Sequence, residues 1–348
     1  MRVLLVTNGL GFGGAERIVE ALAIDLSAAG DQVQVVATTR GGPIGDRLLA
    51  RGIPVAILDL RSRLDVGLPL RLLRIADRFR PDVVHSHLAV SDLAVAMAFW
   101  GRGPRLYSTA HNSGVELDPV KRTLWHLALR RFRRVMPVGP QVAEALPPGL
   151  PITIVEPSLV DPGAPRLSRA EARQRLGLPQ EGPVVLAIGR LVPVKGFDVL
   201  AAARRQLPAQ VTVAVIGEGP LRPELMQAGL TLLGSHADAE LLLPAADVVV
   251  SSSRSEGLPQ VILAALALGL PVVATAVGGT LALIRSEENG LLVPSEDPTA
   301  LAEALRRVLA DPGLAAKFGH AAQAELAEGP RTRAKMVAKV RAIYEGRD

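Results

Sequence analysis

The chain has 348 residues, nearly half of them hydrophobic, which suits two domains that each bury a core. Aromatic residues make up only 3% and cysteine is absent, so base stacking on nucleic acid, disulfides, thiolate zinc sites and a cysteine nucleophile are all excluded as main features. Residues 1–150 carry 19 Lys and Arg against 13 Asp and Glu, a basic balance that fits an anionic membrane surface, an anionic acceptor or an ordinary solvated face.

The first elements predict a βαβ unit. Val3–Thr7 is expected to be a buried strand, the glycine-rich residues 8–14 a loop, Ala15–Ala29 a helix and Gln32–Thr38 a second strand. The N-terminal half should therefore be a Rossmann-like domain. The short apolar start runs directly into the loop, so we expect no signal peptide.

The glycine spacing has a competing interpretation. Gly9, Gly11 and Gly14 fit G-x-G-x-x-G, a dinucleotide-binding pattern, but no acidic residue follows at the end of the second strand. Arg40 stands there and could hold a 2′-phosphate. An NADP-dependent oxidoreductase therefore stays open as an alternative.

Histidines lie at the ends of the next strands. His85 and His87 are two apart in residues 82–88, so they share one face of a strand. No third metal ligand is evident nearby, and a structural role or a position at the edge of a cleft is favoured over a metal pair. His111 and Asn112 follow a strand predicted over Leu106–Ala110.

A basic amphipathic helix is expected over Lys121–Met136. Its apolar face would consist of Trp125, Leu129, Phe132 and Met136, and its basic face of Arg122, Arg130, Arg133 and Arg134. Such a helix can lie on an anionic bilayer. The alternative is a helix whose apolar face packs into the domain core.

A proline-rich boundary over residues 147–165 introduces a second α/β series. A strand over Val184–Ile188 leads into a loop that carries Arg190 and Lys195 before another helix begins. Two fixed cations beside helix amides suit a diphosphate. Residues 213–219 are read as the next strand and loop.

Residues 247–279 read as strand, loop, helix, strand and loop. Glu256 precedes a helix that starts near Pro259 and ends near Gly269, and it lies where ligands bind in parallel sheets. The alternative role is a favourable interaction with the helix dipole. Residues 257–284 carry no charge, but proline and paired glycines divide them into short pieces, so no membrane span is expected.

Several of these stretches resemble glycosyltransferase family 4. They are Gly13-Gly14-Ala15-Glu16-Arg17, residues 155–161, the G-R-L-x-x-x-K-G pattern of residues 189–196, Ser255–Pro259 with Ala265–Ala274, and Leu291–Pro294. The resemblance implies an α/β GT-B fold, two Rossmann-like doubly wound domains facing a cleft. It places an acceptor-binding domain at 1–160, a nucleotide-sugar-binding domain at 161–329, and a last helix, 330–348, that crosses back to the first domain.

The resemblance also implies retaining, metal-independent transfer of a hexosyl-type group from a nucleotide-sugar. The residues it assigns to catalysis are Glu256, His111, Arg190 and Lys195. The residues it assigns to the donor are Gly13, Gly14, Gly189, Gly217, Glu218, Gly219, Ser235, Gly257, Leu258, Pro259 and Ala264. Asn112 is assigned to the acceptor.

One position departs from the family pattern. The second Glu of E-x7-E should be residue 264, and the chain has Ala264, which predicts weakened donor binding. An inactive GT-B protein that binds a nucleotide-sugar is therefore a further alternative. No cofactor is expected beyond the substrate, a uridine diphosphate sugar ahead of a guanosine diphosphate sugar. The acceptor would be a glycan or lipid-linked molecule, and the protein cytoplasmic, at the inner face of the membrane if its basic half binds anionic lipid.

Overall fold

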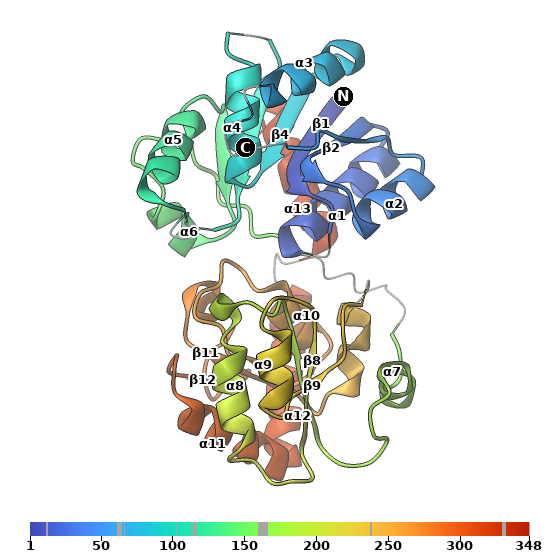
Figure 1. Cartoon of the computed structure of the whole chain (residues 1–348), viewed down its shortest axis with the longest axis vertical. Helices are drawn as coiled ribbons and strands as arrows, with labels where there is room; N and C mark the ends of the chain where they lie inside the picture. The colour runs from blue at the N-terminus through green and yellow to red at the C-terminus, as the bar shows by residue number, and fades with distance from the viewer. Residues whose placement is uncertain are drawn as a thin grey trace. The chain divides into compact units, whose positions relative to one another are not determined.

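The computed structural model of the chain describes residues 1–11, 13–60, 65, 67–101, 103–112, 114, 117–158, 166–236, 239–328 and 332–347. The chain divides into two compact units, Met1–Leu159 with Arg333–Asp348, and Val160–Thr332 (Figure 1). The expected boundary at residues 160 and 161, the motif residues 159–161 and the break at 329–330 lie outside the described residues.

The first unit is built on a six-stranded parallel sheet within the described residues. Its strands are β1 (Arg2–Gly9), β2 (Gln32–Arg40), β3 (Val55–Ile57), β4 (Val83–His87), β5 (Arg105–Ala110) and β6 (Arg134–Pro137). Its helices are α1 (Gly14–Ala28), α2 (Pro43–Ala50), α3 (Leu68–Phe79), α4 (Ala89–Ala98), α5 (Pro119–Leu129), α6 (Pro140–Glu144) and α13 (Arg333–Glu345). The strand order is β3-β2-β1-β4-β5-β6.

Both faces of this sheet are covered, which explains why β1 is an unbroken apolar run. Val3, Leu4, Leu5 and Val6 have no exposed surface, because alternate side chains point to opposite faces and each face carries helices. Helices α1, α2 and α13 share a core with one face. Helix α4 packs on the other, between α3 and α5.

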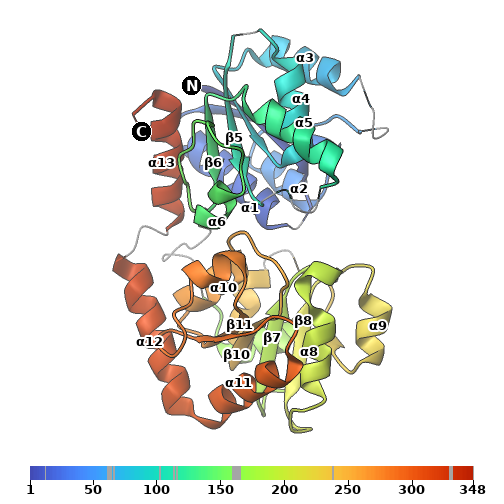
Figure 2. The same cartoon turned by 90° about the vertical axis from the view of Figure 1, so that its left-hand side faces the viewer.

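The C-terminal helix α13 is tied to this first unit by specific contacts (Figure 2). The Tyr344 hydroxyl lies 2.5 Å from Nδ1 of the buried His85, and Tyr107 donates to the carbonyl of Ile343 at 3.3 Å. Arg333 forms a bidentate ion pair with Asp25 on α1. A helix more than 200 residues away in sequence thus completes the core of the N-terminal sheet.

The second unit repeats the plan. Its strands are β7 (Val184–Ile188), β8 (Thr212–Ile216), β9 (Thr231–Leu232), β10 (Val248–Ser251), β11 (Val272–Thr275) and β12 (Leu291–Val293). Its α-helices are α7 (Arg169–Leu176), α8 (Phe197–Arg204), α9 (Arg222–Gln227), α10 (Gln260–Ala267), α11 (Pro298–Ala310) and α12 (Pro312–Glu328). Its 3₁₀ turns are η1 (Pro193–Lys195), η2 (Ala239–Ala245) and η3 (Gly278–Ala282).

The second sheet is also parallel, in the order β12-β11-β10-β7-β8-β9. One face packs against α8, α9 and α11, and the other against α7, η2, α10 and α12. In both sheets the chain reverses its direction of travel next to the first strand, between β1 and β4 and between β7 and β10. Such a reversal point at the carboxyl edge of a parallel sheet is where ligands bind.

The predicted helix over Lys121–Met136 is wrong in its second half. Helix α5 ends at Leu129, and Arg134–Pro137 is the edge strand β6, paired in parallel with β5. The helical spacing of Phe132 and Met136 is overridden by tertiary pairing, since β6 pairs with β5 along its length and buries Val135 and Met136 completely. Trp125 and Leu129, the expected apolar face, are buried in the core.

Among the described residues, no helix is long and apolar enough to cross a membrane.

Candidate functional site

The candidate site lies on the loops that follow β7 and β10 in the second unit. These are the neighbouring strands at the reversal point, so the loop Gly189–Gly196 and the loop Ser252–Pro259 leave the same edge of the sheet side by side. The sequence predicted a diphosphate site on the first loop and a carboxylate on the second. The fold brings the two predicted features together.

An ion pair joins the two loops. Lys195 Nζ lies 2.6 Å from Glu256 Oε1, with side chains 24% and 12% exposed. Ser253 donates its hydroxyl to the same Oε1 at 2.6 Å. No contact is recorded between Oε2 of Glu256 and any described residue, so one oxygen of this carboxylate is held and the other has no partner in the described part of the chain.

Backbone contacts fix the spacing of these loops. Ser252 donates its hydroxyl to the carbonyl of Lys195 at 3.0 Å, and the amide of Arg254 donates to the carbonyl of Val194 at 2.8 Å. Gly196 has φ +60°, and a Cβ there would lie 2.0 Å from the carbonyl oxygen of Ser252. Only glycine permits this approach.

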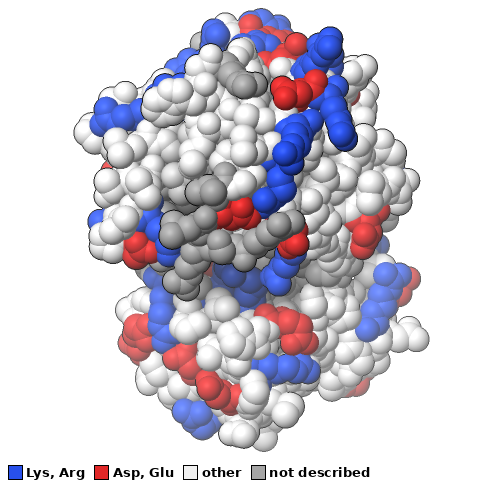
Figure 3. Space-filling model, turned by 45° about the horizontal axis from the view of Figure 1, so that its top comes forward, with Lys and Arg blue, Asp and Glu red and all other residues white. Residues whose placement is uncertain are grey.

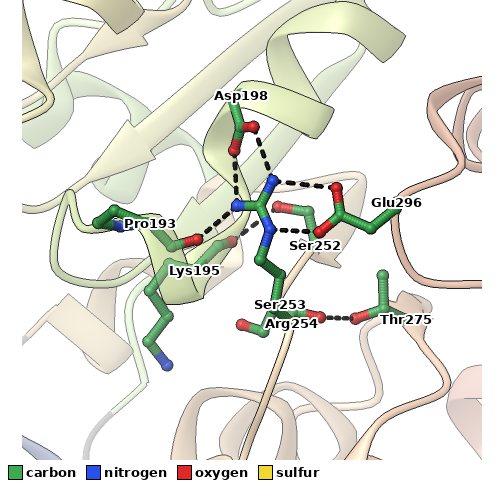
Figure 4. A network of polar contacts seen from close by, with 8 residues as sticks. All are labelled: Pro193, Lys195, Asp198, Ser252, Ser253, Arg254, Thr275 and Glu296. Atoms are coloured by element: carbon green, nitrogen blue, oxygen red, sulfur yellow. Dashed lines mark hydrogen bonds and ion pairs between the residues drawn. The ribbon is translucent and has the colours of Figure 1, made fainter. Parts of the chain in front are cut away.

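Arg254 reinforces the same junction (Figure 4). Its guanidinium makes two hydrogen bonds with Asp198 at the start of α8, at 2.9 and 2.7 Å, two with Glu296 after β12, and one with the carbonyl of Pro193. Bidentate pairing raises the pKa of Arg254 and lowers the pKa of Asp198. Figure 4 shows the side chain of Lys195 leading away from this cluster. Arg254 therefore holds the loops in place from one side, and the side chain of Lys195 extends away from it to pair with Glu256.

The loop after β11 supports Glu256 from another side. The amide of Gly279 donates to the carbonyl of Glu256 at 3.1 Å, and a Cβ at Gly278, where φ is +47°, would lie 2.0 Å from that oxygen. Thr275 donates its hydroxyl to the carbonyl of Ser253 at 2.6 Å. The position of Glu256 is thus set by three loops at once.

The other cation predicted for the diphosphate is placed differently. Arg190 is exposed, and within the part of the chain that the structure describes its side chain has no recorded ion pair or hydrogen bond. Gly217, in the loop after β8, packs closely against Gly189, the neighbour of Arg190. The amide of Gly217 also donates to the carbonyl of Gly234 at 2.7 Å. Arg190 is therefore a free charge beside a rigid loop.

The remaining donor-site predictions fall on the same edge. Glu218 pairs with Arg222 at 2.9 Å, Gly219 packs against the backbone of Leu191, and Ser235 is exposed after β9. Gly257 and Leu258 are half-buried before α10, whose N-cap is the buried Pro259. Ala264 is half-buried in the second turn of α10 and packs against the hydrophobic cluster of that face.

The predicted residues of the first unit occupy the corresponding edge of its own sheet. Gly13 is the N-cap of α1, after β1, and Gly14 is the first residue of that helix. His111 and Asn112 follow β5, one strand beyond β4 in the sheet. Nε2 of His111 lies 3.0 Å from Nδ1 of His87, and Asn112 is exposed.

The sequence did not identify Ser253 or Arg254 as site residues, and it predicted for His87 only a structural role or a position at the edge of a cleft. Ser253 stands three residues before Glu256 in a serine-rich loop, a spacing that could have suggested a contact. No local signal identifies Arg254, because its partners Asp198 and Glu296 are 56 and 42 residues away.

Two family models match the chain, one in each half. Residues 12–157 match the model described as Glycosyltransferase Family 4, and residues 182–311 match the model described as Glycosyl transferases group 1. Neither match supports an NADP-dependent oxidoreductase.

Curated relatives agree with these matches. The D-inositol 3-phosphate glycosyltransferase of Acidothermus cellulolyticus is 36% identical over 287 residues, 68% of this chain and 61% of the relative. The putative teichuronic acid biosynthesis glycosyltransferase TuaC of Bacillus subtilis is 33% identical over 239 residues, 65% of this chain and 61% of the relative. In such alignments the chain spans about half the length of the curated relatives it matches, 46% and 45% in two further cases.

The fold is that of Anabaena Alr3699/HepE, solved in complex with UDP-glucose, with a TM-score of 0.89, 22% identity, and coverage of 99% of this chain and 100% of that one. The likeness confirms the predicted GT-B fold.

The Arg254 cluster predicts a local effect on loop order. Arg254→Gln keeps the backbone amide contact to Val194 but removes the ion pairs that join three loops. We expect amide hydrogens of residues 190–196 and 252–258 to exchange about tenfold faster, since local opening would cost roughly 1.4 kcal/mol less. Hydrogen–deuterium exchange with mass spectrometry measures this directly.

Arg307→Gln is the matched control. Arg307 on α11 forms a bidentate ion pair with Glu287, with distances of 2.5 and 2.7 Å, in the same unit. Glu287 comes just before the amino end of β12, whereas the two loops leave the carboxyl edge of the sheet. Arg307→Gln should leave exchange in the two loops unchanged. If amide exchange in the two loops were accelerated equally in both variants, Arg254 would have no special role at this junction.

Proposed function

The chain belongs to glycosyltransferase family 4, and from this premise we propose that it transfers a glycosyl group from a nucleoside diphosphate sugar to an acceptor. The observation that carries the proposal is the contact of Lys195 with Glu256 at the reversal point of the second sheet, with Arg190 unpaired beside it. A cation for the leaving group and a carboxylate for the sugar stand next to each other there.

The cations act on the leaving group. When a glycosidic bond to a diphosphate breaks, negative charge grows on the departing phosphate and positive character grows on the sugar ring. Arg190 and Lys195 stabilise that negative charge. Lys195 is already held by Glu256 before the reaction, so its charge needs little reorganisation, whereas the exposed Arg190 is ordered when the ligand binds. The two cations supply the charge that a divalent cation would otherwise provide, so we propose a metal-independent reaction.

Glu256 acts on the sugar. Its Oε1 is occupied by Lys195 and Ser253, so its Oε2 is the acceptor that sugar hydroxyls can reach. A carboxylate with one oxygen fixed cannot rotate freely, and it therefore orients the ring while the bond breaks. We propose no covalent nucleophile. Retention of configuration follows if the acceptor attacks from the face that the diphosphate leaves, with a departing phosphate oxygen taking the proton.

The donor is proposed to carry uridine diphosphate. The support is the likeness in fold to the Anabaena protein, which was solved with UDP-glucose. The acceptor is proposed to be a glycan or a lipid-linked molecule bound by the first unit, with His111 and Asn112 at its edge. The names of the two relatives above refer to different molecules, D-inositol 3-phosphate in one and teichuronic acid in the other, so the acceptor of this chain is left at that class.

An anionic membrane surface is proposed as a partner of the first unit. Five large apolar side chains are exposed on two helices that pack against each other, Val120, Leu124 and Leu127 on α5 and Met97 and Trp100 at the end of α4. We call these five residues the α4–α5 patch. Trp100 is 70% exposed, and the guanidinium of Arg131 lies 4.1 Å from its ring centre.

Charge around the α4–α5 patch suits anionic lipid. Lys121, Arg122, Arg130 and Arg131 are all exposed on or just after α5. On the face drawn in Figure 3, basic side chains form several separate groups, some of them beside acidic side chains. An apolar patch with a basic rim binds a membrane interface more strongly than scattered charge does. This surface differs from the expected one, because Trp125, Leu129 and Met136 are buried.

The donor assignment is tested by charge removal. Arg190→Ala and Lys195→Ala should each lower affinity for a uridine diphosphate sugar, and the rate of transfer, by roughly tenfold to a hundredfold, since a charge-assisted contact is worth about 1.5–3 kcal/mol. Calorimetric titration and a transfer assay with lipid-linked and glycan acceptors give the two readouts.

Arg306→Ala is the control, because Arg306 is an exposed cation in the second half of α11, which runs away from the carboxyl edge. Arg190→Ala should also keep full thermal stability, whereas Lys195→Ala leaves Glu256 without its cation. Unchanged affinity and turnover in both variants would rule out the diphosphate site. Donor binding without any transfer would favour the inactive binding protein.

Ala264 is proposed to weaken the donor site. By the family resemblance a carboxylate at this position accepts hydrogen bonds from the ribose, and alanine cannot. Ala264→Glu should tighten binding of a uridine or guanosine diphosphate sugar about tenfold or more, with little change in fold stability, because the helix is preserved. Calorimetry on both forms is the measurement.

Ala267→Glu provides the comparison, since it adds the same carboxylate about one turn further along α10, also at a half-buried position. If neither substitution tightens donor binding, residue 264 does not face the ribose.

Membrane binding is tested with vesicles. The protein should sediment with vesicles that contain phosphatidylglycerol at low salt and much less with pure phosphatidylcholine. Replacing both Leu124 and Leu127 with serine should weaken this association about tenfold. The double change Leu49→Ser with Ile57→Ser, at two exposed apolar residues elsewhere in the first unit, should not. Equal binding by all forms would exclude the α4–α5 patch.

A further inference from the structure

Three histidines meet at the carboxyl edge of the first sheet, next to its reversal point. His85 and His87 lie on one face of β4, with ring centres 4.3 Å apart, and the ring centre of His111 lies 5.3 Å from that of His87. Only His111 has a role in the proposed function. The other two are fully buried, and a buried imidazole with no role of its own raises the question of what it does for its neighbour.

The ring of His85 is held in a fixed orientation next to the other two histidines. Its Nδ1 lies 2.5 Å from the hydroxyl of Tyr344 and its Nε2 lies 2.8 Å from the hydroxyl of Thr109. Both ring nitrogens are used, so the ring cannot turn without losing a hydrogen bond. Burial lowers the pKa of His85 to about 3 and that of His111 to about 4, and it lowers the pKa of His87 as well. All three rings are therefore neutral near pH 7, and each carries one proton on one nitrogen.

The contacts of His87 constrain where its proton sits. Nδ1 of His87 lies 3.0 Å from Nε2 of His111, so one of these nitrogens donates and the other accepts. Nε2 of His87 is buried and has no partner among the described residues. If the proton were on that nitrogen, an N–H donor would be buried without an acceptor. With the proton on Nδ1, the donor is used and only a lone pair is left unpaired.

A proton on Nδ1 of His87 costs less free energy than a proton on Nε2, because buried N–H groups without acceptors are rarer in proteins than buried acceptors without donors. It also determines the proton of His111. Nε2 of His111 then accepts, so its proton must be on Nδ1. No partner is recorded for that nitrogen in the described part of the chain, and the His111 side chain is only partly buried.

We propose that His87 is a positioning residue, which donates from Nδ1 to Nε2 of His111 and holds His111 as the Nδ1–H tautomer. His111 then presents an N–H donor, and not a lone pair, to a ligand at the edge of the sheet. Neutral His111 thus binds an oxygen of the sugar or acceptor and does not accept a proton from it. The ligand part of this inference rests on the proposed function, whereas the tautomer does not.

The tautomer is measured by long-range ¹H–¹⁵N correlation spectra of protein labelled with ¹⁵N-histidine at pH 7.5. The chain has only six histidines, and His320 is exposed on α12 and serves as the internal reference. We expect His87 and His111 each to show a protonated Nδ1 and an unprotonated Nε2. A protonated Nε2 on His111, or exchange between both forms, would overturn the proposal without any reference to enzymatic activity.

Two substitutions separate positioning from packing. The side-chain amide of His87→Asn can place an N–H where Nδ1 stood, whereas His87→Ala cannot. We expect His87→Ala to release His111 into both tautomers and to lower kcat for transfer by at least about tenfold, with affinity for UDP changed less than about threefold.

His87→Asn should restore the single tautomer and most of kcat. Loss of kcat to the same extent in both variants, with the His111 tautomer unchanged in each, would mean that His87 only fills space. If neither variant nor the parent protein shows transfer, the proposed function fails, and the ¹⁵N spectra still decide the role of His87.

Discussion

The ion pair of Lys195 with Glu256 is the contact on which the donor-site interpretation depends. It joins the loops that follow β7 and β10, the two strands where the second sheet reverses. Both side chains are mostly buried, so each charge depends on the other for the stabilisation that water no longer supplies. Ser252, Arg254 and the glycines at 196 and 278 fix the backbone that carries the pair. Contacts of the surrounding backbone thus fix the positions of the charged Lys195 and Glu256. Oε2 of Glu256 and the guanidinium of Arg190 are left for a ligand.

The two units use the same strand order for different chemistry. In the second unit the edge at the reversal point carries cations and a carboxylate, which suit a diphosphate sugar. In the first unit the corresponding edge carries three neutral histidines, anchored through Tyr344 to the last helix of the chain. Burial lowers the pKa of His85, His87 and His111 and leaves hydrogen-bond donors and acceptors without net charge, whereas the mostly buried Lys195 and Glu256 stabilise each other as an ion pair.

The parts that sequence predicted are those encoded by local pattern. The strand ending at Ile188, its cationic loop and the strand-loop-helix around Glu256 each carry their own turn and cap residues, so they could be read within about ten positions. The second half of the Lys121–Met136 helix failed because pairing of β6 with β5 outweighs helical periodicity. The α4–α5 patch could not be found from α5 alone, since it depends on which face packs on the sheet. The clamp by Arg254 and the contact of His87 with His111 depend on residues distant in sequence, and no local rule identifies them.

We propose that the cations after β7 bind the second phosphate of a nucleoside diphosphate. Calorimetric titration of the unmodified protein with uridine diphosphate and with uridine monophosphate tests it most directly, because the two ligands differ only in that phosphate. We expect the diphosphate to bind at least about tenfold more tightly, as one charge-assisted contact of about 1.5–3 kcal/mol requires, and we expect the difference to shrink at high salt. Equal affinity for the two ligands would contradict it.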